Sequence, residues 1–147
     1  MKPFRFRLET LLDFRRLQKE QAQLAFMQAT NQLQAEKERL KQLEGMLAES
    51  MELLNVRRQQ PLPVEVFKSY QYYFDKIGED IHKQNQCVMQ ATNNYQACLS
   101  KLAEAEKEHK IVEKFREKKL QNYQLEVMNE EQKVLDEIGL QIYTRDK

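Results

Sequence analysis

Two Glu-x-x-His pairs, Glu79–His82 and Glu106–His109, come closest in type and spacing to a catalytic site. On a helix, this spacing places a carboxylate and an imidazole on one face, as in di-iron helix bundles, where four helices converge on the metals. Both pairs fall on the same predicted helix, about 40 Å apart at 1.5 Å of rise per residue. They cannot share a metal, so a metal-dependent helix-bundle oxidoreductase is disfavoured and we predict no metal site.

Other patterns that carry chemistry are missing from the chain. It has no Gly-rich phosphate loop, no Gly-x-Ser-x-Gly and no paired His/Cys spacing of a zinc site. Cys87 and Cys98 lie roughly 16 Å apart along one predicted helix, too far for a disulfide. They are interpreted as reduced packing or surface thiols. We therefore predict no catalytic residue and no cofactor, and expect a binding protein, not an enzyme.

The composition is typical of long helices. The chain has three Gly, three Pro and no Trp in 147 residues, and 32% of its residues are charged. The formal net charge of +1 argues against nucleic acid as a partner. No window approaches 18 uncharged apolar residues, so we expect no transmembrane segment.

Three prolines divide the chain into its predicted elements. Because Pro3, Pro61 and Pro63 leave two long stretches without a proline, each stretch can form an unbroken helix. The sequence predicts a helix over about 8–57, a turn over about 58–63 and a helix over about 64–140. Together they are expected to form a single coiled-coil domain over 1–147.

Heptad spacing supports both helices. Positions alternating by three and four in the first helix are Phe26, Ala29, Leu33, Glu36, Leu40, Leu43, Leu47, Ser50 and Leu54. The same alternation in the second gives Phe67, Tyr70, Phe74, Ile77, Ile81, Gln84, Val88, Ala91, Tyr95, Cys98, Leu102, Ala105, His109 and Val112. Runs this long are typical of coiled coils.

The two helices are predicted to pair with each other in antiparallel order. A turn centred near residue 62 makes the numbers of facing residues sum to about 124. The resulting layers are Leu54/Tyr70, Ser50/Phe74, Leu47/Ile77, Leu43/Ile81, Leu33/Ala91, Ala29/Tyr95, Phe26/Cys98 and Ala22/Leu102. Large side chains repeatedly face small ones, which favours an intramolecular hairpin over the alternative of a parallel dimer. The fold class is therefore all-α: two long helices in an antiparallel coiled-coil hairpin, with the second helix longer and overhanging.

Some positions of the predicted seam carry polar residues, and some apolar positions of the second helix have no partner on the first. Glu36 and Gln84 fall in neighbouring layers, where a hydrogen-bonded step would fix the alignment of the helices. Arg15 and His109 are expected to share a layer. The overhang carries an apolar stripe with no intramolecular partner expected: Leu120, Tyr123, Val127, Val134, Ile138 and Ile142.

Two surfaces are candidates for binding. At the basal end, where the start of the first helix meets the second, cations predominate and apolar residues lie off the seam. The candidate contacts there are Phe14, Arg15, Arg16, Leu17, Lys118 and Lys119. Near the turn, Tyr72 and Tyr73 lie off the seam, with Met46 as a possible neighbour on the other helix. Exposed tyrosines favour a partner contact, although packing against neighbouring Lys or Arg stems is the alternative.

Several motifs, in order along the chain, resemble the FliJ family of the bacterial flagellar type III export apparatus. They are an opening Phe-x-Phe-x-Leu (Phe4, Phe6, Leu8), Leu11-Leu12, Tyr70-Gln71 after the turn, the block 112–119 and Asp136-Glu137-Ile138. The resemblance covers essentially the whole chain, including its length.

This resemblance implies a cytoplasmic stalk, peripherally associated with the membrane at the export apparatus. Its basal end would bind within the ring of the export ATPase (a FliI-type hexamer). The hairpin near the turn would contact the cytoplasmic domain of the export-gate membrane protein (FlhA-type), and export chaperones would be escorted. Gln84 and Asp80 depart from the family pattern, so only Tyr73 and Ile77 are carried over as gate contacts, beside Tyr72 and Met46. A generic cytoplasmic scaffold or chaperone, or the equivalent stalk of a virulence type III secretion system, remains the alternative.

Overall fold

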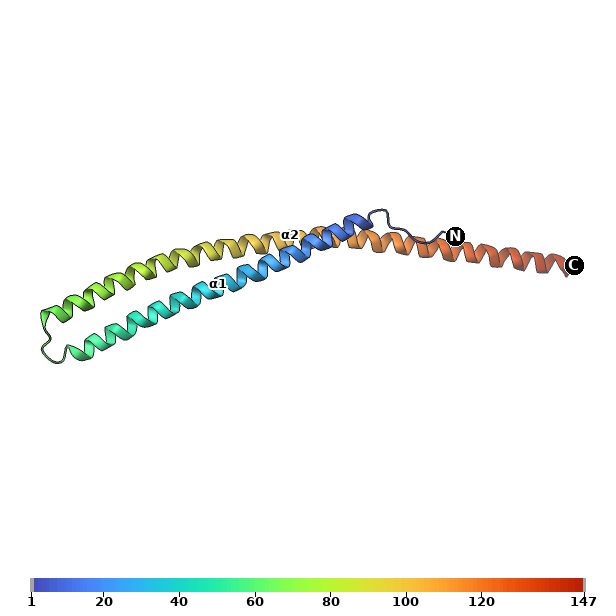
Figure 1. Ribbon diagram of the computed structural model, residues 1–147. Coiled ribbons are helices and arrows are strands. Elements are labelled where there is room, and N and C mark those ends of the chain that lie inside the picture. The colour runs from blue at the N-terminus through green and yellow to red at the C-terminus, as the bar shows by residue number, and fades with distance from the viewer. Residues whose placement is uncertain (1, 147) are drawn as a thin grey trace. The chain divides into compact units, whose positions relative to one another are not determined.

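Two long helices form the computed structural model, which describes residues 2–146 (Figure 1). Helix α1 spans Glu9–Arg57, 49 residues, and α2 spans Val64–Arg145, 82 residues. They pack against each other in antiparallel order and are joined by a short connection over 58–63 (Figure 1). The all-α prediction of a two-helix hairpin with a longer second helix is confirmed.

Local chemistry explains where the helices stop and start at the turn. The amide of Arg58 still donates to the carbonyl of Leu54 at 2.9 Å, and the amides of Gln59 and Gln60 then make longer bonds, of 3.4 and 3.3 Å, to carbonyls three residues back. The carbonyl of Pro63 accepts bonds from the amides of Val66 and Phe67 in the first turn of α2, at 3.1 and 3.4 Å. Because the prolines at 61 and 63 lack an amide hydrogen, neither can extend α1, and Pro63 is well placed before a helix.

The described residues divide into two compact units, each considered by itself below. The turn unit comprises residues 22–102, with the connection between the helices. The terminal unit comprises residues 2–21 and 103–146. The expectation of one domain over 1–147 stays a prediction.

The core of the turn unit is a single seam between α1 and α2. Its buried apolar side chains are those of Ala29, Leu33, Leu43, Leu54, Ile77 and Ala91, all at predicted heptad positions. The rings of Phe26 and Tyr95 pack with centroids 5.2 Å apart, which agrees with the predicted register to within one layer. Since each helix has only one apolar face, this seam is the only place where apolar surface of the unit can be buried in quantity.

A polar contact interrupts the seam at the predicted place. Gln84 Nε2 donates to the backbone carbonyl of Glu36 at 2.9 Å and also to the Glu36 carboxylate. A slip of one heptad would place Glu36 opposite Ile77 or Ala91 and leave a half-buried carboxylate without its donor. The contact therefore opposes slippage of the two helices.

Truncation of a seam leucine tests this account of the core. Leu43 is 4% exposed and Leu53 is 55% exposed, so the two leucines differ in burial but not in type. Leu43→Ala is expected to lower the free energy of unfolding by about 2 kcal/mol or more, because it leaves a cavity. Leu53→Ala is expected to change it by less than about 0.5 kcal/mol. Urea denaturation followed by circular dichroism measures both, and equal losses would contradict the seam.

Candidate functional site

The residues of the two Glu-x-x-His pairs either lie apart from each other or take part in packing. His109 is buried, and its Nδ1 lies 3.3 Å from the carboxylate of Glu113, one helical turn on, with no contact to Glu106. His82 lies beside Gln86, with 3.5 Å between their Nε2 atoms. Within residues 2–146, no three His, Cys, Asp or Glu side chains are grouped to hold a metal ion.

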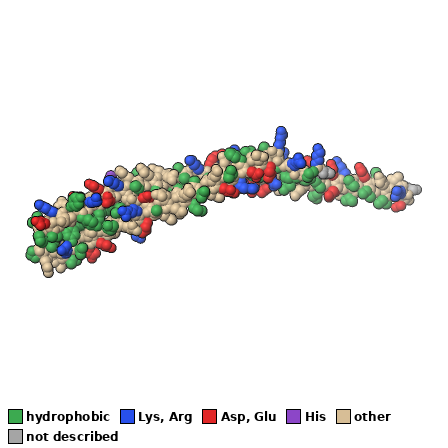
Figure 2. All heavy atoms as spheres, in the orientation of Figure 1, with side chains coloured by type: hydrophobic (Ala, Val, Ile, Leu, Met, Phe, Trp, Pro, Cys, Tyr) green, Lys and Arg blue, Asp and Glu red, His purple; other side chains and the backbone are tan. Residues whose placement is uncertain are grey.

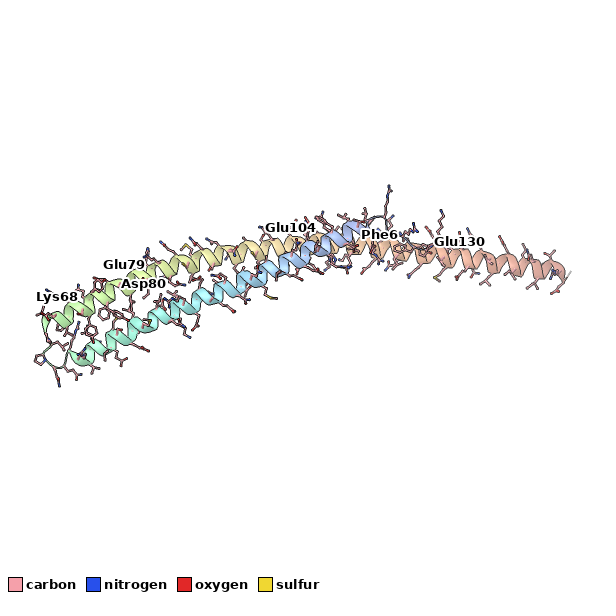
Figure 3. All side chains as sticks on the ribbon, viewed as in Figure 1. Phe6, Lys68, Glu79, Asp80, Glu104 and Glu130 are labelled. Carbon is pink, nitrogen blue, oxygen red and sulfur yellow. The ribbon has the colours of Figure 1, made fainter. Side chains whose placement is uncertain are left out.

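An N-terminal arm, residues 2–8, is the main feature of the terminal unit that the heptad pattern did not predict. It runs alongside α2, and Figure 3 shows Phe6 against that helix. The ring of Phe4 packs on Tyr123 with centroids 5.5 Å apart, and Phe6 packs on Phe115 at 5.9 Å. The hydroxyl of Tyr123 donates to the carbonyl of Lys2 at 2.5 Å. The arm therefore supplies an intramolecular partner for Tyr123, and the expectation of none was wrong.

Helical spacing did not predict the arm, because residues 2–8 are not helical. Phe4 and Phe6 were a usable signal all the same, since two aromatic residues before the first helix favour packing on an apolar surface. On α2, Phe115 and Tyr123 lie about two turns apart and provide that surface.

Ion pairs hold α1 against α2 in the same unit. Arg116 Nε donates to the Glu9 carboxylate at 3.0 Å, and its guanidinium also lies over the ring of Phe4, 5.7 Å from the centroid. Arg15 pairs with Glu108 at 2.5 Å. The expected shared layer of Arg15 and His109 stays a prediction.

The candidate basal residues differ in whether contacts within the chain already engage their side chains. Arg15 is engaged with Glu108, whereas Arg16 approaches Asp13 only at 4.0 Å. Lys118 is exposed, and Lys119 lies over the ring of Phe115, 5.4 Å from its centroid. Phe14 and Leu17 are 52% and 51% exposed. The terminal unit therefore presents both cations and apolar side chains to solvent.

The last part of α2 keeps an exposed apolar stripe. Leu120 and Val127 are half-buried, but Val134, Ile138 and Ile142 are each close to half exposed. Acidic side chains accompany the stripe, among them Glu130 and Glu131. The expectation of an uncovered stripe is thus met only beyond Val127.

A second candidate surface lies near the turn, where green hydrophobic side chains gather in Figure 2. Tyr72 is 72% exposed and Met46 is 44% exposed, while Tyr73 is 36% exposed and its ring packs 6.2 Å from that of Phe74. Ile77 is only 4% exposed. Tyr72, Tyr73 and Met46 can therefore touch a partner directly, whereas Ile77 supports the seam beneath them.

A comparison with family models decides the family of this chain. The model described as flagellar FliJ protein matches residues 4–147. The chain belongs to the FliJ family. It is therefore a component of a flagellar or type III export apparatus, and FliJ proteins act there without enzymatic activity of their own.

A likeness in fold accompanies the family match. A structure described as that of a YscO homologue, CT670, from Chlamydia trachomatis superimposes with a TM-score of 0.62 at 17% identity. The alignment covers 97% of this chain and 96% of that one. At this identity the likeness concerns the fold alone. No curated protein sequence matches the chain. In the part of the chain described here, neither helix is long and apolar enough to cross a membrane.

The packing of the arm can be followed with a single fluorescent residue, because the chain has no Trp. Phe4→Trp places an indole on Tyr123, where it is partly shielded from water. Adding Tyr123→Ala removes a ring contact of about 0.5–1.5 kcal/mol together with the bond to Lys2. Because the indole then meets more water, we expect its emission to shift to longer wavelength and acrylamide to quench it more readily. Adding Tyr72→Ala instead is the control and leaves the emission unchanged; equal emission in all three proteins would mean that the arm does not pack on α2.

Proposed function

We propose that this FliJ-family chain is the stalk of a flagellar export apparatus and joins its ATPase to its membrane gate. In this proposal the terminal unit binds within the ring of a FliI-type ATPase hexamer. The turn unit contacts the cytoplasmic domain of an FlhA-type gate protein. The chain would work in the cytoplasm, at the membrane face of the apparatus, and would also escort export chaperones.

The observation that carries the ATPase contact is the pairing of free charge with exposed apolar surface in the terminal unit. Phe14 and Leu17 are half exposed on α1, and Arg16, Lys118 and Lys119 have no close ion pair among the described residues. Exposed apolar side chains beside uncompensated charge are typical of a surface that binds another protein. A ring interior of acidic or polar character would complement it.

The gate contact rests on the tyrosines of the turn unit. Tyr buries a large surface with few rotatable bonds, so it loses little conformational entropy when it docks. Tyr72 extends into solvent, and Tyr73 is braced by the Phe74 ring beside it. We propose Tyr72, Tyr73 and Met46 as direct contacts, with Ile77 holding their helix in place.

Two alternatives remain to be separated from this proposal. The likeness to the YscO homologue is compatible with the equivalent stalk of a virulence secretion system, and an isolated scaffold or chaperone needs no ATPase. Co-purification with a flagellar export ATPase hexamer distinguishes the proposal from both. Binding to export chaperones with no ATPase in the complex would favour the scaffold.

Charge reversal tests the ATPase contact. Arg16→Glu/Lys118→Glu/Lys119→Glu is expected to leave helicity intact, because none of the three is buried, and to raise the concentration for half-maximal ATPase stimulation on the order of tenfold. Added salt should likewise raise the concentration of the wild-type chain needed for half-maximal ATPase stimulation. Arg15 is left unchanged, since its reversal would break the pair with Glu108.

The matched control carries the same three charge reversals in the turn unit, as Arg39→Glu/Lys41→Glu/Lys83→Glu. All three of these side chains are exposed. It should stimulate the ATPase like the wild type. Stimulation that is insensitive both to the first set of reversals and to salt would remove this surface from the mechanism.

Substitution of the tyrosines tests the gate contact. Each of Tyr72→Ala and Tyr73→Ala is expected to cost about 1–3 kcal/mol of affinity for the purified gate domain if both are hot spots. The free energy of unfolding should change by less than about 1 kcal/mol, since both residues are exposed. Calorimetric titration and a motility assay are the measurements. Met27→Ala/Met89→Ala, at two exposed methionines of the same unit, is the control, and normal binding and motility in the tyrosine double variant would contradict the proposal.

A further inference from the structure

The arm and α2 enclose an open groove in the terminal unit. Arm residues line one side, and the α2 face from Phe115 to Glu126 lines the other. Its floor is aromatic, because Phe4 and Phe6 pack on Tyr123 and Phe115. Of the candidate contacts described above, the arm groove shares Lys119 alone; Phe14, Leu17 and the tyrosines near the turn do not line it.

The rim of the arm groove is strongly basic. Lys2, Arg5, Arg7 and Lys119 line it, against a single carboxylate, that of Glu126. Among residues 2–146, Arg5 and Arg7 form no ion pair, whereas the neighbouring Arg116 is already held by Glu9. The groove therefore carries an excess of positive charge that the carboxylate of Glu126 alone does not balance.

The backbone of the arm is also free to bind. The arm has no helical structure before residue 9, and its carbonyls at Lys2 and Phe6 accept bonds from Tyr123 and from the amide of Glu9. Within the described chain, the amides of Phe4, Arg5 and Phe6 donate no hydrogen bond. Backbone amides without a partner can donate to the carbonyls of an extended segment bound alongside.

We propose that the arm groove binds an extended acidic segment of a partner protein, in which Asp or Glu alternates with apolar residues. In an extended segment, successive side chains point to opposite faces. One face of the bound segment therefore meets the cations of the rim, among them Arg5 and Arg7, while the other meets the aromatic floor. Acidic residues suit the first face and apolar residues the second.

This pattern separates a peptide from other anions. A compact anion such as phosphate is bound best by donors that converge on one point, whereas these cations are distributed over the arm and α2. An anionic membrane surface would use the same cations but has no need of the free amides. The combination of basic rim, aromatic floor and free amides favours the acidic segment.

The test uses the full chain and a fluorescein-labelled peptide of sequence Glu-Phe-Glu-Val-Glu-Phe-Glu. Saturable binding by fluorescence anisotropy, weakened by salt, is expected. Arg5→Glu/Arg7→Glu should weaken binding at least about tenfold, because two opposed charges become like charges. Arg39→Glu/Lys41→Glu reverses two exposed cations with the same spacing on α1 and should leave binding unchanged.

Two further measurements vary the peptide sequence and replace the peptide with a lipid surface. A peptide of the same composition with its Glu grouped at one end should bind clearly more weakly. Equal binding of the two peptides, or no effect of the Arg5 and Arg7 reversal, overturns the proposal. Sedimentation with phosphatidylglycerol vesicles but no peptide binding would assign the arm groove to a lipid surface instead. Because peptide binding is measured on this chain alone, it stands or falls separately from ATPase stimulation.

Discussion

Burial of one apolar seam between α1 and α2 is the interaction on which the rest of this structure depends. In the turn unit, each helix contributes small and large side chains at heptad spacing, and Leu43, Ile77 and Ala29 are nearly inaccessible to water. A helix pair has no second layer to cover its outer faces. Every residue off the seam is therefore available to solvent or to a partner, and the same constraint that forms the hairpin also exposes Tyr72 and Leu17.

Apolar contacts alone would allow the helices to slide by a heptad, because most layers are chemically alike. The bonds from Gln84 to Glu36 distinguish one alignment from its neighbours. Arg15 with Glu108 and Arg116 with Glu9 do the same in the terminal unit. These contacts decide which side chains share a face, so the composition of each binding surface follows from the register.

The arm adds a different kind of packing. Its Phe4 and Phe6 rings cover part of the α2 stripe that α1 leaves bare, and Arg116 connects the arm to the start of α1 through Phe4 and Glu9. A few non-helical residues therefore suffice to contact Phe115 and Tyr123. Beyond Val127 the apolar side chains of the stripe are exposed again.

By itself, the sequence determined the two helices, their antiparallel pairing and the Glu36–Gln84 contact, because heptad spacing and proline positions are local and repetitive signals. It also indicated the FliJ family, through the order of short motifs along the chain. Only the tertiary structure decided that the arm packs on Tyr123, that Arg15 pairs with Glu108, and that Ile77 is buried and not exposed beside Tyr73. Long side chains can reach several neighbours from one helical position. A non-helical arm has no periodicity that predicts its contacts on a distant helix, so these contacts depend on three-dimensional proximity.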